Sequence, residues 1–413
     1  MKPEELTING TRVWKFFRGE EVLGYLGIDT EIAGKACGGL RYLPDVDAEE
    51  IAGLARAMTL KYGFLGLPQG GSKAGIIALP GEDEAARKKR LRDFGQALTP
   101  WLKDGKYFPG TDMGINIDDL NVIIHAAGIS LKPWQLGCRE SGIYTAATVF
   151  AGIQAACRQK GRQVKECTFS IEGFGAVGGS LAGMLHQAGG KVVAVSTTYG
   201  TAYEENGLDI PCLVKESAKG EKQLFEKISS RGRINHDELK ELAVDVFSPC
   251  ARHDSITGEN ASNIQAWAVV PGANNPVTPD AERILLSRGI SVIPDFVSNS
   301  GGVLGGTMAF AGVEHSRIIS FILRRFDPVY LHLYQENAST GMSLREVAEK
   351  LSGERHRKTR EKSDHPSLPG KLLRQGLGLY RAGLFPKRIM GWISMSYFKN
   401  LPVFSEIPGR ISG

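Results

Sequence analysis

Hydrophobic and polar positions change their spacing several times along the chain, and each change marks a predicted structural element. Apolar residues recur at helical spacing between positions 51 and 58, which predicts an amphipathic helix. Asp47, three residues before Glu50, is typical of a helix N-cap. The predicted helix carries Lys61 in its last turn and ends at Gly63.

The stretch after this helix is rich in glycine, so we interpret it as a loop whose backbone N–H groups can approach a small anion. Lys73 lies in this loop and is followed by the apolar run 76–79. We therefore expect Lys73 in the wall of a cleft, where desolvation would lower its pKa and suit acid–base chemistry. Considered alone, Lys61 could simply complement a helix C-terminus, and Lys73 could be an ordinary surface lysine.

From residue 165 the pattern changes to strand, loop, helix and strand. The loop has the spacing G-x-G-x-x-G, which indicates dinucleotide binding when it opens a helix in such a unit. Gly173 would make the tight turn, Gly175 would let a pyrophosphate approach, and Gly178 would let the helix pack against the strand. The predicted cofactor-binding residues of this loop are Gly173, Phe174, Gly175, Ala176, Val177 and Gly178.

The end of the second strand bears on which cofactor is bound. An acidic residue there would accept hydrogen bonds from the ribose of NAD and would repel a 2′-phosphate. This chain has Ser196, Thr197 and Thr198 at that point and no adjacent arginine. Both NAD and NADP therefore remain open as cofactors, with Thr197 as a predicted contact.

Composition and charge are those of a globular protein, with 42% hydrophobic and 23% charged residues in a chain of 413. The net charge of +5 gives no indication of a nucleic-acid partner, and none is expected. The six cysteines have no metal-binding spacing, so we expect reduced thiols, no metal and a cytoplasmic location. No apolar run is long enough to predict a membrane span.

Lys61, Lys73 and the turn of residues 68–71 between them together resemble the glutamate/leucine/phenylalanine/valine dehydrogenases. Further motifs resemble this family in the same order along residues 22–310. They are Gly38-Gly39-Leu40-Arg41, Asp112-x-Gly, the glycine-rich loop, the Gly-Ala-Asn-x-Pro-x-Thr-like stretch of residues 272–278, and residues 299–303.

The resemblance implies an α/β fold of two domains, a Rossmann-like doubly wound cofactor domain and an α/β substrate domain, with a cleft between them. We expect a substrate-binding and oligomerisation domain at 1–136 and an NAD(P)-binding domain at 137–300. Residues 301–352 would form a helical return to the substrate domain. Residues 353–413 would be a charged linker and a C-terminal segment, which could pack on the first domain or bind a partner or a membrane surface.

The activity that the resemblance implies is NAD(P)-dependent oxidative deamination of an L-amino acid to a 2-oxo acid and ammonia, or the reverse reaction. Lys61 would hold the α-carboxylate, Lys73 would polarise the carbinolamine oxygen and activate water, and Asp112 would carry the proton of the amine. The other implied substrate contacts are Gly38, Gly39, Gly70, Gly71 and Val303. The other implied cofactor contacts are Ser141 and Asn274.

Two departures from the family pattern concern the substrate side chain. Glutamate-specific members carry a lysine where this chain has Cys37, and a polar residue where it has Gly306. Both departures remove groups that would hold a distal carboxylate, so we expect a non-acidic amino acid. The family also implies a homo-oligomer assembled through the first domain. A diverged dehydrogenase for an unusual amino acid or amine, and a non-catalytic cofactor-binding regulatory subunit, remain alternatives.

Overall fold

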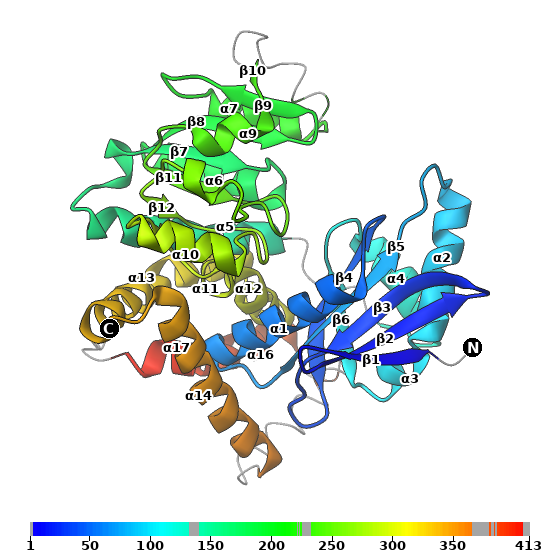
Figure 1. Ribbon diagram of the computed structural model, residues 1–413. Coiled ribbons are helices and arrows are strands. Elements are labelled where there is room, and N and C mark those ends of the chain that lie inside the picture. Colours follow the sequence, from blue (N-terminus) through cyan, green and yellow to red (C-terminus); the bar gives the residue numbers. More distant parts are fainter. Residues whose placement is uncertain are drawn as a thin grey trace. The chain divides into compact units, whose positions relative to one another are not determined.

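The computed structural model describes residues 3–131, 140–220, 222, 224, 233–365, 380, 384 and 386–407. The chain divides into two compact units, each with its own sheet (Figure 1). Unit 1 comprises Met1–Arg139, Phe310–Val313 and Leu351–Pro402, and unit 2 comprises Glu140–Ala309, Glu314–Lys350 and Val403–Gly413.

The sheet of unit 1 has six strands in the order β1-β2-β3-β5-β4-β6. The first three strands and β5 are antiparallel neighbours, whereas β4 runs parallel to both β5 and β6. The bounds are β1 Glu4–Ile8, β2 Thr11–Arg18, β3 Glu21–Ile28, β4 Ala36–Leu43, β5 Gly70–Ile77 and β6 Tyr107–Thr111.

Helices cover both faces of this sheet, because neighbouring residues of a strand point to opposite sides. Val13 and Tyr25 join the start of α1 in one apolar cluster. Trp14 and Leu26 join α2 and α4 in another. These helices and α3 have the bounds α1 Ala48–Leu65, α2 Glu84–Ala97, α3 Thr99–Lys103 and α4 Ile117–Ala126.

Helix α1 begins as predicted and ends later than predicted. The Asp47 carboxylate accepts the N–H of Glu50 at 2.7 Å, as an N-cap does. The helix does not stop at Gly63 but continues to Leu65, and Gly66 in the left-handed conformation (φ 73°) ends it. Gly63 has a different role, because a Cβ there would overlap Ser352 of a later helix.

The glycine-rich stretch predicted to be a loop is the central strand β5, which pairs with β3 on one side and β4 on the other. Its small residues allow close packing rather than irregular backbone. A Cβ at Gly71 would overlap the backbone of Thr59 in α1, and a Cβ at Gly38 would overlap the Ser72 carbonyl. Lys73 is therefore a strand residue held between two neighbouring strands.

Unit 2 contains a seven-stranded sheet in the order β10-β9-β8-β7-β11-β12-β13. Strands β8, β7, β11, β12 and β13 are parallel, as in the expected Rossmann-like sheet, whereas β9 and β10 add an antiparallel edge. The bounds are β7 Thr168–Glu172, β8 Lys191–Thr197, β9 Gly200–Tyr203, β10 Arg233–Ile234, β11 Val246–Pro249, β12 Ala268–Val269 and β13 Ser291–Val292.

The longest helix in the described ranges, α13, packs along α5 in unit 2. The Tyr330 hydroxyl donates to the Thr148 carbonyl at 2.9 Å, which fixes the two helices together inside the core. Within residues 140–340, the described helices and 3₁₀ turns are α5 Ser141–Gln159, η2 Val164–Glu166, α6 Ala176–Gln187, α7 Ile210–Ser217, α9 His236–Glu241, η4 Ala261–Asn263, α10 Pro279–Ser287, α11 Asp295–Ser298, α12 Gly301–Phe310 and α13 His315–Thr340.

The C-terminal part is more helical than the sequence suggests. Residues 353–364, expected to be a linker, belong to α14 (Leu344–Asp364), because buried Ser352 and Arg355 tie this charged helix to α1. The rest of the expected linker, 366–370, lies outside the described residues. Among the described residues after α14 are the helices α16 Lys387–Lys399 and α17 Pro402–Ser405.

Gly38→Ala should destabilise the protein strongly, because the added methyl group overlaps the neighbouring strand backbone. We expect a loss of about 2–3 kcal/mol or more in the free energy of unfolding, measured by urea denaturation. Gly110→Ala on adjacent strand β6 is the matched control, since a Cβ there meets nothing within 4 Å. Equal losses in the two variants would contradict this account of the sheet.

Candidate active site

Three charged side chains meet in the sheet of unit 1. Lys73 of β5 forms an ion pair with Oδ2 of Asp112, which directly follows β6. The guanidinium of Arg41, from β4 between these strands, reaches the same oxygen at 3.2 and 3.3 Å. The second oxygen, Oδ1, accepts the N–H of Met113 at 2.8 Å. The structure thus brings the predicted pair of Lys73 and Asp112 together and adds Arg41 to it.

Burial and charge shift the proton affinities of this cluster. Burial lowers the pKa of Lys73 below the ordinary 10.5; Asp112 opposes this shift and Arg41 reinforces it. Burial alone would raise the pKa of Asp112, but Lys73 and Arg41 hold that pKa well below its ordinary value. Asp112 is therefore ionised at neutral pH, and Lys73 gives up its proton more readily than a free lysine. This lowering of the Lys73 pKa is in the direction that suits a group that gives and takes protons.

Arg41 is a site residue whose role the sequence did not reveal. It also pairs with Glu50 of α1, and both side chains are buried, with 3% and 9% exposed. The sequence suggested Glu50 only as part of a helix cap. A charged residue in a strand that is otherwise apolar could have signalled Arg41, since a buried arginine needs buried acids nearby.

Lys61 is buried on α1, with 4% of its surface exposed. Helix α14 holds the backbone on either side of it. The Ser352 hydroxyl donates to the Leu60 carbonyl and Arg355 donates to the Phe64 carbonyl, both at 2.8 Å. The Arg355 guanidinium also lies 5.4 Å from the centre of the Phe64 ring. A segment almost three hundred residues away thus fixes the turn that carries Lys61.

The four predicted glycine contacts differ in what surrounds them. A Cβ at Gly39 would lie 3.0 Å from Asp112 Cβ and 3.3 Å from Lys73 Nζ, so Gly39 keeps space open beside the charged pair. Gly38, Gly70 and Gly71 are restricted by backbone that a Cβ would overlap. The structure therefore shows that these three glycines allow close packing of the strands and of α1 around the site.

Cys37, at the position that suggested a non-acidic substrate, lies in a neutral polar environment. Its thiol hydrogen-bonds with the hydroxyl of Tyr62, and burial raises the pKa of the thiol above 9.0. The Tyr107 hydroxyl donates to the carbonyl of neighbouring Gly38 at 3.2 Å. Cys37 is therefore an uncharged thiol, and the two buried tyrosines beside it were not singled out from the sequence.

The glycine-rich loop in unit 2 has the geometry that its spacing predicted. Gly173 has φ 90°, and a Cβ there would lie 3.0 Å from Ala251. A Cβ at Gly178 would overlap the Gly173 carbonyl, whereas one at Gly175 would meet nothing within 4 Å. Helix α6 starts at Ala176 without an acidic residue in its first turn or a side-chain cap. Its N-terminal N–H groups suit a phosphate, which supports the predicted pyrophosphate site.

Residues of the glycine-rich loop and of the end of β8 also make contacts that fix the loop. Phe174 is buried, and a Cβ at Gly272 would lie 2.9 Å from Val177. Ser196 accepts the N–H of Gly173 at 2.9 Å, a contact that the sequence did not reveal. Thr197 forms a local turn, accepting the Tyr199 N–H at 3.2 Å.

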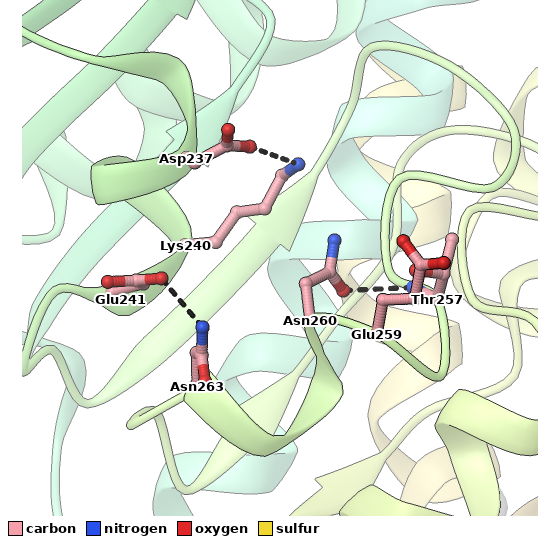
Figure 2. A pocket seen from close by; sticks show the side chains of 7 residues that line it. All are labelled: Asp237, Lys240, Glu241, Thr257, Glu259, Asn260 and Asn263. Atoms are coloured by element: carbon pink, nitrogen blue, oxygen red, sulfur yellow. Dashed lines mark hydrogen bonds and ion pairs between the residues drawn. The ribbon is translucent and has the colours of Figure 1, made fainter.

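A polar cavity of about 300 Å³ lies in unit 2, and Figure 2 shows its lining. Lys240 pairs with Asp237 at 3.4 Å and lies 3.9 Å from Glu172, which directly precedes the glycine-rich loop. None of these residues was predicted from the sequence. The lining consists of Asp237, Lys240, Glu241, Thr257, Glu259, Asn260 and Asn263.

The predicted cofactor contact Asn274 is held by Asn299, which the sequence indicated only as the first residue of a family motif. Asn299 donates to the Ala273 carbonyl at 2.8 Å and to Asn274 Oδ1 at 3.2 Å. Asn299 is buried, and its Oδ1 has no hydrogen-bond partner among the described residues. A buried acceptor of this kind suits a ligand amide or hydroxyl.

Ser141 and Val303 lie on α5 and α12, which are in contact. Ser141 is the first residue of α5 and is half-buried, like Val303. A Cβ at Gly302 would lie 3.5 Å from the Ser141 carbonyl, which brings the two predicted residues near each other. At Gly306 a Cβ would meet nothing within 4 Å. The position that is polar in glutamate-specific enzymes is thus open here.

Two family models match the chain. The model described as Glutamate/Leucine/Phenylalanine/Valine dehydrogenase matches residues 137–320, and its dimerisation domain matches residues 14–127. The chain belongs to this dehydrogenase family. The family and fold predicted from the sequence are therefore confirmed: the protein is an NAD(P)-dependent amino acid dehydrogenase, an oxidoreductase acting on CH–NH₂.

Two relatives that are similar in sequence are glutamate dehydrogenases. An NAD-specific glutamate dehydrogenase of Staphylococcus aureus (strain COL) is 35% identical over 294 residues, covering 68% of this chain and 70% of that protein. The catabolic NAD-specific glutamate dehydrogenase RocG of Bacillus subtilis (strain 168) is 36% identical over 296 residues, covering 68% of each.

Two solved structures are informative. The hetero-hexameric glutamate dehydrogenase of Thermus thermophilus in its Leu-bound form has a TM-score of 0.72, with 25% identity over 86% of this chain and 88% of that one. The L-tryptophan dehydrogenase of Nostoc punctiforme shares the fold, with a TM-score of 0.59 and 23% identity, covering 85% and 97% of the two chains. Within the described ranges, no helix of this chain is long and apolar enough to cross a membrane.

Asp112→Asn should lower stability most at neutral pH, because it leaves Lys73 and Arg41 as buried cations without their shared carboxylate. Breaking such a pair costs about 3–5 kcal/mol. The folded-state pKa of Asp112 is depressed, so its contribution is full above the unfolded pKa of about 3.9 and declines as the pH falls below that value.

Urea denaturation between pH 7 and pH 3 checks this prediction. The difference between wild type and Asp112→Asn should stay constant down to about pH 4.5 and then shrink. Asp118→Asn, which alters an exposed carboxylate in the first turn of α4, should show a small difference at every pH. A difference for Asp112→Asn that grows toward acid pH would refute the depressed pKa.

Proposed function

We propose that this dehydrogenase deaminates an L-amino acid with a non-acidic side chain, in a homo-oligomer, and uses NAD or NADP. The buried pair of Lys73 and Asp112 carries the proposal. A lysine whose pKa is lowered, next to an ionised carboxylate, supplies the base and proton carrier that deamination needs. The reverse reaction, reductive amination of a 2-oxo acid, would use the same groups.

Each residue of the site has a step in this proposal. Lys61 would bind the α-carboxylate, and Asp112 would take a proton from the substrate ammonium. A bound nicotinamide would supply the acceptor for the hydride of Cα, and the substrate would then be an imino acid. Lys73 would then take a proton from water as the water adds to the imino carbon. Its ammonium would then polarise the carbinolamine oxygen, while Asp112 returns its proton to the nitrogen. Ammonia would leave and take up the hydroxyl proton, giving the 2-oxo acid and an ammonium ion, and Lys73 would release its proton to solvent.

The cofactor proposal is supported by unit 2. The uncapped start of α6 and Gly175 suit the pyrophosphate, and Asn274 with the open acceptor of Asn299 suits the nicotinamide end. The similar enzymes of S. aureus and B. subtilis are named NAD-specific. Strand β8 ends in Ser196 and Thr197 rather than in a carboxylate, so NADP would meet no acidic residue there.

The substrate proposal is supported by Cys37 and Gly306. The thiol of Cys37 is uncharged and hydrogen-bonds with Tyr62, so it offers no cation to a distal carboxylate. Gly306 adds no polar side chain. Among proteins of this fold, the Nostoc enzyme is a tryptophan dehydrogenase, whereas the Thermus enzyme and the named relatives with higher identity are glutamate dehydrogenases.

Lys73→Ala should reduce kcat by about 10²–10⁴ without weakening NADH binding, because only the proton-transfer group is lost. Turnover is measured as reduced-nicotinamide absorbance with NAD and NADP against a panel of L-amino acids, and binding as NADH fluorescence. Lys103→Ala, at an exposed lysine of the same unit, should retain full activity. An active Lys73→Ala enzyme would overturn the catalytic assignment.

The same panel separates the alternatives. Turnover of leucine, valine or phenylalanine without glutamate supports the proposed substrate class. Turnover of glutamate would overturn that class and leave the mechanism standing. Cofactor binding without turnover of any substrate would favour an unusual amine or a regulatory subunit.

Cys37→Lys should shift selectivity toward glutamate, because a lysine there could pair with the distal carboxylate. We expect the ratio of kcat/KM for glutamate to that for leucine to rise by at least about tenfold, equivalent to 1.4 kcal/mol. Cys37→Ala is the control and should leave this ratio unchanged, since it removes the thiol without adding a charge. A ratio that does not change in the lysine variant would show that Cys37 lies outside the side-chain pocket.

A further inference from the structure

Helix α16 has an apolar face on each side. Its inner face is anchored in unit 1: Met390 and Phe398 are buried, and a Cβ at Gly391 would overlap the Gly312 carbonyl. Its outer face carries exposed side chains at helical spacing. They are Ile389, Trp392, Ile393 and Tyr397, with 48%, 75%, 46% and 42% of their surfaces exposed.

Exposed large apolar side chains are concentrated in this part of the chain. Eleven large apolar side chains are exposed in the part of the chain that the structure describes, and five of them lie within residues 384–397. The fifth is Leu384, which is 74% exposed. A contiguous apolar patch on an ordered helix is typical of an interaction surface. It lies beyond residues 14–320, where the family models match.

The surrounding charge indicates an acidic partner surface. Residues 386–405 contain no acidic residue, and α16 begins with Lys387 and ends with Lys399. Unit 1 itself carries the complementary charge. The carboxylates of Glu4, Asp47 and Glu49 lie around Tyr25, whose pKa is raised by burial and then by these three groups.

We propose that the outer face of α16 packs against a second copy of this chain and so forms part of the subunit interface. This inference rests on the homo-oligomer of the proposed function. Helix α16 belongs to the same compact unit as the residues that match the dimerisation domain. A second copy also presents both the apolar and the acidic surface that α16 needs, and exposed aromatic residues such as Trp392 and Tyr397 are typical of such a contact.

The test is the molar mass of the full chain, measured by light scattering after size-exclusion chromatography. The double variant Trp392→Glu with Ile393→Glu should form a smaller assembly than wild type, with an unchanged circular dichroism spectrum. Leu331→Glu is the matched control: Leu331 is 48% exposed on α13 of unit 2, and this variant should keep the wild-type mass. If the double variant does not fold, Trp392→Ser should still raise the concentration needed for assembly.

Several results would overturn the proposal. One is an unchanged mass in the folded double variant, and another is a wild-type monomer at all concentrations. A third is sedimentation of wild type, but not of the variant, with phosphatidylserine vesicles at unchanged mass, which would assign α16 to an anionic lipid surface. Molar mass tests the interface, and turnover tests the proposed function. If the protein assembles through Trp392 but turns over no amino acid, the proposed function is refuted and the interface is not.

Discussion

The buried ion pair between Lys73 and Asp112 is the interaction on which unit 1 depends. Removing two charges from water is costly, so such a pair persists only where further hydrogen bonds satisfy it. Arg41 and the N–H of Met113 provide them, and Glu50 balances Arg41 in turn. The charges come from three adjacent strands and the helix that covers them, so the packing of the sheet and the acidity of the site are set together.

The sequence predicted the parts of this arrangement that depend on local spacing. The cap at Asp47, the glycine-rich loop before α6 and the order of the family motifs follow from a few neighbouring residues. The stretch around Lys73 was predicted wrongly as a loop, because glycine indicates flexible backbone and close packing equally well. The glycines are explained by packing only once the neighbouring elements are known: a Cβ at Gly71 would overlap Thr59 of α1, and a Cβ at Gly38 would overlap Ser72.

Contacts between distant segments could not be predicted from spacing. Arg41 needs Glu50 and Asp112, and the turn that carries Lys61 is fixed by Ser352 and Arg355 of a helix whose charged sequence suggested a linker. In unit 2, the hydroxyl of Ser196 that fixes Gly173 and the open acceptor of Asn299 likewise appear only once the strands are assembled. The motifs thus indicate the chemistry, and the supporting contacts come from tertiary structure.

The most direct test of the account is the pKa of Lys73 in the folded protein. An NMR titration of lysine labelled at Cε, with the Lys73 resonance assigned by its loss in Lys73→Arg, measures this value. The account predicts a pKa below the ordinary 10.5, because burial and Arg41 outweigh the attraction of Asp112. A pKa at or above 10.5 would contradict it, since Lys73 would then be a permanent cation and no base for the water that attacks the imino acid.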